Sequence, residues 1–220
     1  MKRLVMVLAL VLMAGACTKV EPGYVGIKVN MYGDQKGIED FPLQTGRVHF
    51  NPITEDVYKF PTFIQNFVWT ADKAEGSPNN DEITFNSVEG AVVSADIAVG
   101  FLVEAEKVPS IFVEFRKPID EIRDVYIRSQ VRDAFGRHAS KMKVTDIFGV
   151  QKQTLLDAVK SDLNDNLGPR GITFDMISFV GGLRVDPRVQ ESINAVLEAA
   201  QKAIEAGTRS VSLRPKQLRR

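Results

Sequence analysis

The chain of 220 residues is poor in the side chains that most often build metal centres and nucleophilic active sites. It has a single cysteine, Cys17, and two histidines, His49 and His138, which lie far apart in the sequence. One cysteine excludes an intramolecular disulfide. The spaced motifs of zinc proteases, serine hydrolases and phosphate-binding loops are also missing. We therefore expect structural roles for both histidines, no cofactor, no metal and no enzymatic activity.

Basic residues are scarce in the body of the chain, although the formal net charge is zero. Of the 28 basic residues, two lie at positions 2 and 3, and five lie in the last 14 residues, which contain no acid. Residues 17–206 thus hold 21 basic and 28 acidic side chains. Since phosphate contacts need clustered Lys and Arg, this body argues against a nucleic-acid partner. Residues 207–220 are expected to be a disordered basic tail, though such a tail can also contact anionic lipid or nucleic acid.

The longest apolar run lies at the N-terminus, where residues 1–16 have the three parts of an export signal. Lys2 and Arg3 are basic, residues 4–13 are apolar, and residues 14–16 are small. The apolar run is shorter than the roughly 20 residues that span a bilayer comfortably. The segment therefore predicts export of the chain.

Cys17 directly follows the small residues of this segment, and the arrangement resembles the lipobox of bacterial lipoproteins. The resemblance implies cleavage before Cys17, attachment of diacylglycerol to that residue and anchoring through the lipid. Lipoboxes usually have Leu where Ala14 stands, and residues 14–16 also fit an ordinary cleavage site. Plain secretion and a retained N-terminal anchor are the alternatives.

A long period-two pattern in residues 83–103 predicts a central pair of antiparallel strands. The two runs flank Glu89 and Gly90, and Gly90 can adopt the positive φ that tight hairpin turns commonly need. The opposite face of the second strand is smaller and more polar. Residues before the hairpin resemble further strands. The face expected to be buried carries Ala91, Val93, Ala95, Ile97, Val99, Phe101 and Val103.

Helical patterns dominate the chain after this hairpin. We predict helices over residues 105–115, 118–136 and from 145 or 148 to 167, followed by a strand over 172–180 that returns to the sheet. Gly181 and Gly182 are expected to make a bend. Asp162 and Asp165 are expected to lie on a solvated helix face.

Asp186 and Pro187 predict the start of a last helix over residues 186–206, because Asp is a favoured N-cap and Pro is favoured at the first helical position. Its apolar residues are spaced alternately four and three positions apart, as in a coiled coil. Two heptads are also compatible with packing against the same domain, so self-association and intramolecular packing both remain open. The expected self-association stripe comprises Val189, Ile193, Val196, Leu197, Ala200, Ala203 and Ile204.

In this order the segments resemble an SPFH domain, also called a band 7, prohibitin-homology or stomatin-like domain, over about residues 19–206. The resemblance is carried by VEPGYVGIKV, GRVHFNPITEDVYKFP, VEGAVVSADIAVGFLV, IRDVYIRSQVRDAFGRHAS, GITFDMISFVGGLRVDP and AQKAIEA. It implies an α+β domain with a curved, mainly antiparallel sheet flanked by helices, followed by a coiled-coil helix that drives assembly. It also implies a membrane-attached oligomer that scaffolds bilayer patches or restrains a membrane-bound protease.

These observations predict a signal peptide (1–16), an SPFH domain (17–185), a short coiled-coil helix (186–206) and a basic tail (207–220). Family helices usually continue for many heptads, whereas Gly207 and Thr208 are expected to interrupt this one. The expected partners are the membrane through a lipid on Cys17, further copies or a related SPFH subunit, and a membrane protease. The expected location is the periplasmic or cell-surface side of a membrane. The alternative is a monomeric exported lipoprotein that binds a ligand or a protein.

Overall fold

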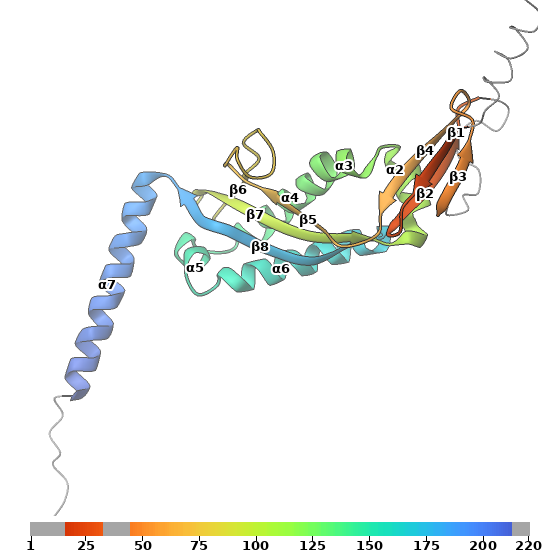
Figure 1. Ribbon diagram of the computed structural model, residues 1–220. Coiled ribbons are helices and arrows are strands. Elements are labelled where there is room, and N and C mark those ends of the chain that lie inside the picture. The colour runs from red at the N-terminus through yellow and green to blue at the C-terminus, as the bar shows by residue number, and fades with distance from the viewer. Residues whose placement is uncertain (1–15, 33–44, 213–220) are drawn as a thin grey trace, which may run out of the picture.

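The computed structural model of the protein describes residues 16–32 and 45–212. Two antiparallel strand pairs lead into a long curved sheet with helices packed on it, and a single helix follows at the far end (Figure 1). Each strand pairing in the described ranges is antiparallel. The predicted α+β class with a curved antiparallel sheet is therefore confirmed. The predicted signal peptide, except Ala16, and positions 213–220 of the predicted tail lie outside the described residues.

The N-terminal part consists of two separate strand pairs. Strand β1 (Ala16–Val20) pairs with β3 (Gly46–Phe50), and β2 (Tyr24–Asn30) pairs with β4 (Glu55–Pro61). The turn at residues 51–54 joins β3 to β4, where Asn51 and Pro52 interrupt the strand pattern. Branched and aromatic side chains of the four strands provide the apolar core of this part. They are Val20, Val25, Ile27, Val48 and Phe60.

The central sheet is built around β7 (Val92–Val103). Strands β5 (Gln65–Trp69) and β6 (Ile83–Asn86) pair with successive stretches of one edge of β7, and β8 (Ile172–Val185) pairs with the other edge. Gly90 has a φ of 79°, as the predicted hairpin requires. Ala91 precedes β7 and is half-buried, but the predicted buried face is confirmed for the other six residues, which have no solvent exposure. They are Val93, Ala95, Ile97, Val99, Phe101 and Val103.

Helices cover the buried face of this sheet, with α4 against β6 and α6 against β8, and these two helices also contact each other. The predicted helix over 118–136 is present, but the part that follows its first turn is wound more loosely than an α-helix. That part is a π-helical segment over residues 122–127. The helices between β7 and β8 are α2 (Val108–Phe115), α3 (Ile119–Glu121), α4 (Arg128–Ala139), α5 (Val144–Phe148) and α6 (Lys152–Leu167).

Asp162 on α6 links two helices, so the expectation that it is merely solvated was wrong. It accepts a hydrogen bond from Arg137 Nη2 at 2.7 Å and lies 3.2 Å from His138 Nε2, both on α4. Partial burial alone would raise the pKa of Asp162, but the hydrogen bond and charge of Arg137 outweigh it and lower that pKa. The periodicity of α6 could not show these partners, because they come from another helix.

Candidate membrane-anchoring and self-association surfaces

Cys17 lies on strand β1, and its side chain is exposed. The antiparallel register places it directly opposite His49 on β3, and the Sγ atom lies 2.6 Å from His49 Nδ1. Opposite residues of an antiparallel pair project from the same face, which is why two side chains 32 positions apart meet here. The sulfur is thus accessible at the surface and has a hydrogen-bonding neighbour that the sequence did not reveal.

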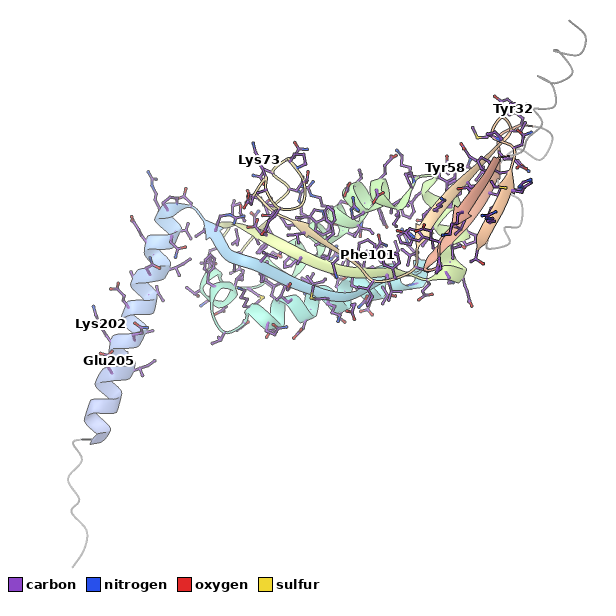
Figure 2. All side chains as sticks on the ribbon, viewed as in Figure 1. Tyr32, Tyr58, Lys73, Phe101, Lys202 and Glu205 are labelled. Carbon is purple, nitrogen blue, oxygen red and sulfur yellow. The ribbon has the colours of Figure 1, made fainter. Side chains whose placement is uncertain are left out.

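Exposed apolar residues gather at the same end of the N-terminal strands as Cys17. Strand β1 begins opposite Phe50, which leads into the turn that carries Ile53. The backbone N–H of Met31 donates to the carbonyl of Thr54 at 2.7 Å, so the end of β2 meets this turn. The side chains of Met31, Tyr32 and Ile53 are each more than half exposed, and Figure 2 shows Tyr32 at the tip of the molecule.

At the opposite end of the molecule, β8 bends before it continues into helix α7 (Pro187–Ser212) (Figure 1). Residues 181–183 of β8 lie opposite the single residue Ala95 of β7, and Gly181 has a φ of 74°. An extra length of chain in one strand bends that strand, and glycine adopts a positive φ at little cost. The bend expected at Gly181 and Gly182 is therefore present inside a longer strand than predicted.

Arg184 fixes the end of β8 to the central sheet just before α7 begins. Its Nη1 and Nη2 each donate to one carboxylate oxygen of Asp96 at 2.7 Å, and Nη2 also contacts Glu82 at 2.7 Å. The hydrogen bond from Arg184 lowers the pKa of Asp96 despite partial burial of the carboxylate. This two-pronged contact holds the base of α7 in a defined position.

Helix α7 begins where the sequence predicted. The side chain of Asp186 accepts a hydrogen bond from the backbone N–H of Arg188 at 2.9 Å, which is the expected N-cap interaction. Its end was predicted too early, because α7 continues through Gly207 and Thr208 to Ser212. A single glycine costs a helix only about 1 kcal/mol relative to alanine, which does not by itself end a helix. Residues 207–212 therefore belong to α7 rather than to a tail.

The body of the protein covers the first part of the predicted self-association stripe, and the rest of the stripe is exposed to solvent. Ile193 is 2% exposed and belongs to the hydrophobic core, and Val189 is packed against that core. Val196 is 54% exposed and Ile204 is 69% exposed. Ala200 and Ala203 are also exposed, and the side chain of Leu197 lies outside the described part of the chain. The body thus covers the start of the stripe and leaves its continuation accessible.

Within residues 16–32 and 45–212, no helix combines the length and apolar character needed to cross a membrane. The same residues contain no group of three or more His, Cys, Asp or Glu side chains arranged to hold a metal ion.

Comparison with known proteins identifies the family of the chain. A search of curated proteins finds no match. The family model described as SPFH domain / Band 7 family matches residues 18–211, which is most of the chain and includes β2 to β8 and nearly all of α7. Proteins of this family are membrane-associated and scaffold-like in general. The curved sheet, the helices that cover it and the extended terminal helix agree with that match, and the chain therefore belongs to the SPFH domain / Band 7 family.

Proposed function

We propose that this chain is a lipid-anchored SPFH subunit that self-associates through α7 and organises a patch of membrane or restrains a membrane-bound protease. In this proposal the acylated Cys17 holds the N-terminal strands at the bilayer, on the periplasmic or cell-surface side. The partner along α7 is a second copy of the chain or a related SPFH subunit.

The observation that carries the proposal is the accessible part of the α7 stripe. Helix α7 has 26 residues, and at about 1.5 Å per residue it is roughly 39 Å long. It extends away from the body (Figure 1), and Val196, Ala200 and Ala203 lie along its exposed part at spacings of four and three residues. Apolar residues with this spacing form the contact line between paired helices. Burial of the stripe by a neighbouring α7 removes apolar surface from water.

A comparison of the free energy of burial with the free-energy cost of association indicates that a stable assembly needs more than one such contact. Burying a valine side chain contributes about 1.5 kcal/mol, and alanine contributes less. Association of two free chains costs at least about 4 kcal/mol in lost translational and rotational freedom. Anchoring at Cys17 lowers this cost, because chains confined to a membrane surface are already concentrated and oriented. Lipid attachment and helix pairing therefore support each other in this proposal.

The N-terminal end has the features of a surface facing lipid. Cys17 is exposed and accessible to acylation, and Met31, Tyr32 and Ile53 at the same end present apolar surface. Diacylglycerol on Cys17 supplies two acyl chains, and apolar contacts beside them strengthen the anchoring further. Since α7 lies at the other end (Figure 1), the helix is expected to stand away from the bilayer.

Substitution of Val196 tests self-association. Val196→Asp places a charge on the exposed stripe, whereas Ala195→Asp places the same charge about 100° around the helix, on its polar side. We expect native mass spectrometry of the membrane-extracted full chain to show multimers for the parent and for Ala195→Asp, and monomers for Val196→Asp. Multimers that persist unchanged in Val196→Asp would contradict the proposal, and a parent that is monomeric would favour an exported binding protein instead.

Intact mass tests the anchor. We expect the mature chain to begin at Cys17 and to carry acyl chains, and we expect Cys17→Ser to lack them and to lose its stable membrane association. His49→Ala is the control, because it removes the neighbour of the sulfur but leaves the sulfur in place. A mass that shows cleavage without acylation would rule out lipid anchoring and leave plain export.

A further inference from the structure

The strand pair β1–β3, at the N-terminal end of the molecule (Figure 1), has one exposed face that carries basic side chains beside Cys17. In the antiparallel register Cys17 lies opposite His49 and Lys19 lies opposite Arg47, and all four residues are exposed. Side chains alternate between the two faces of a strand, so these four share a face. Val48, between two of them, is on the other face and is buried. We call the exposed surface formed by these four residues the basic face.

The basic face holds two cations, Lys19 and Arg47, directly opposite each other. The Cβ atoms of opposite residues in an antiparallel pair are about 4.5–5.5 Å apart, and like charges in such positions destabilise the pair. Lys19 Nζ lies 4.0 Å from Glu21 Oε1, but the two side chains are 70% and 64% exposed, and such a pair contributes at most about 1 kcal/mol. Arg47 has no ionic partner among the residues that the structure describes. The basic face therefore carries positive charge that a bound anion would neutralise.

The position of Cys17 determines which anion lies against the basic face. In the proposed function the sulfur carries diacylglycerol, which brings it to the level of the glycerol groups of neighbouring lipids. Lys19 and Arg47 are two residues along their strands from Cys17 and His49, a distance of about 7 Å. The phosphates of phospholipids are bonded to those glycerol groups and therefore lie within reach of both cations. A lysine contacts a phosphate as a point charge, and the planar guanidinium of an arginine donates two parallel hydrogen bonds to it.

The charge of the rest of the chain makes contact through this face more favourable than contact through another. Residues 17–206 contain 28 acidic and 21 basic side chains, so an anionic surface repels the body as a whole. At physiological ionic strength, exposed charges separated by more than about 8 Å are largely screened from each other. A bilayer in contact with the basic face therefore responds mainly to Lys19, Arg47 and the weakly paired Glu21, which together leave a positive excess.

We propose that the basic face binds the headgroup phosphate of an anionic phospholipid beside the acylated Cys17. Phosphatidylglycerol represents this class, because the phosphate is its only ionic group. A zwitterionic headgroup such as phosphatidylcholine carries its own cation, which competes with Lys19 and Arg47 for the phosphate. The proposal deepens the proposed function by naming the lipid class at the anchor, and it rests on the contact of Cys17 with the bilayer. It does not depend on self-association through α7.

The test measures headgroup binding to the membrane-extracted full chain, labelled with ¹⁵N-arginine and held in micelles of an uncharged maltoside detergent. Phosphatidylglycerol or phosphatidylcholine is mixed into the micelles at the same mole fraction, and inorganic phosphate in solution is the third probe. Binding is followed by NMR through the side-chain Nε signal of Arg47, which is assigned as the signal missing from Arg47→Gln.

Lys19→Gln removes one cation of the basic face without removing the Arg47 signal. Its matched control is Lys73→Gln, because Lys73 is also exposed and lies in the loop between β5 and β6, away from the N-terminal strands (Figure 2). The intact mass of the same sample reports acylation separately. An unacylated Cys17 would contradict the proposed anchor, whereas absence of headgroup binding in an acylated sample would contradict the present proposal alone.

We expect phosphatidylglycerol to shift the Arg47 signal and phosphatidylcholine to shift it far less. Binding of phosphatidylglycerol should be roughly fivefold weaker in Lys19→Gln and unchanged in Lys73→Gln. The urea unfolding midpoint of Lys19→Gln should not fall, because the substitution removes repulsion between opposite residues, whereas a lysine with a merely structural role would lower it. The proposal is overturned if phosphatidylglycerol causes no shift, if phosphatidylcholine or inorganic phosphate shifts the signal equally, or if Lys19→Gln binds as tightly as the parent.

Discussion

Strand β7 and helix α7 both carry apolar residues at regular spacings, but those of β7 are buried and several of those of α7 are exposed to solvent. Six alternating side chains of β7 are fully buried, whereas Val196 on α7 is 54% exposed. Strand β7 has strands on both edges and helices over one face. Helix α7 has the body only beside its first turns, where Val189 and Ile193 pack. A regular apolar pattern therefore identifies a surface whose burial is favourable. Whether the same chain buries that surface depends on which other elements pack against it.

The largest effect is expected at the centre of β7. Phe101 has no solvent exposure and lies against Phe174 of β8, with ring centroids 6.2 Å apart. Phe101→Ala should lower the free energy of unfolding by about 3–5 kcal/mol, because a buried ring is removed and a cavity remains. Urea unfolding of the full chain followed by circular dichroism measures this change. A loss below about 1 kcal/mol would show that the sheet does not depend on this contact.

The same substitution, valine to alanine, can be made in β7 and in α7 to compare the two regions directly. Val99→Ala should destabilise the chain by roughly 2 kcal/mol, because Val99 is fully buried. Val196→Ala should change stability by less than about 0.5 kcal/mol in dilute, monomeric protein. Unfolding curves at several protein concentrations separate folding from association, because only the latter makes the effect of Val196→Ala grow with concentration. Equal losses for both variants in the dilute monomer would refute the difference between the regions.

The contact between β7 and the end of β8, just before α7, should depend on pH. Asp96→Asn removes the charge that binds Arg184 and should cost about 1–3 kcal/mol at neutral pH. Since the folded protein lowers the pKa of Asp96, the ionised carboxylate stabilises the fold above the unfolded pKa of about 3.9. This stabilisation is lost as the pH falls through the folded value. The difference in Tm between parent and variant should therefore shrink from pH 6 to pH 3, and a constant difference would contradict this assignment.

A modest effect is expected at the edge of the body, where Glu89 contacts α5. Its carboxylate accepts a hydrogen bond from the backbone N–H of Val144 at 2.9 Å, and this bond lowers the pKa of Glu89. Glu89→Gln keeps an acceptor but loses the charge, so stability should fall by less than about 1 kcal/mol. Because the folded pKa is lowered, the loss should be present at neutral pH and vanish in acid. Thermal unfolding of the parent and the variant at pH 7 and pH 3 measures this loss of stability. A larger loss at pH 3 than at pH 7 would contradict the prediction.

Periodic elements were predictable because their pattern repeats over neighbouring positions. The buried face of β7 follows from side chains that alternate between two faces, and the start of α7 follows from the local preference of Asp186 and Pro187. The end of α7 was not predictable in the same way, since Gly207 weakens a helix without determining where it ends. The π-helical segment over 122–127 likewise has no signal in the spacing of its apolar residues.

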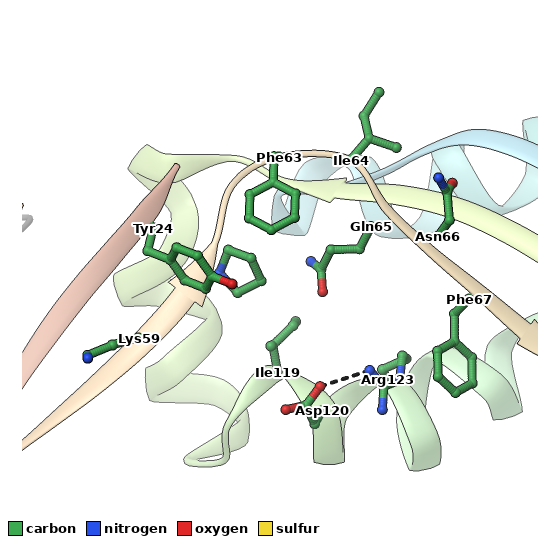
Figure 3. A pocket seen from close by; sticks show the side chains of 11 residues that line it. Tyr24, Lys59, Phe63, Ile64, Gln65, Asn66, Phe67, Ile119, Asp120 and Arg123 are labelled. Atoms are coloured by element: carbon green, nitrogen blue, oxygen red, sulfur yellow. Dashed lines mark hydrogen bonds and ion pairs between the residues drawn. The ribbon is translucent and has the colours of Figure 1, made fainter. Parts of the chain in front are cut away.

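The pocket of about 360 Å³ between the N-terminal strands, β5 and α3 (Figure 3) could not be predicted, because its residues come from segments that are distant in the sequence. Tyr24 lies on β2, Phe63 follows β4, Gln65 lies on β5 and Ile119 lies on α3. Each of these residues by itself resembles an ordinary strand or helix residue.

The amino-acid sequence by itself determined the α+β class, the faces of the central strands, the start of α7 and the position of Cys17 after a small-residue segment. These are local properties that depend on side-chain volume, polarity and backbone preference within a few residues. The tertiary structure alone decided that Cys17 meets His49, that Arg184 binds Asp96 across 88 positions, and that Ile193 is covered while Val196 is accessible. Such contacts depend on how distant segments pack against one another, because packing brings together groups that have no fixed spacing along the chain.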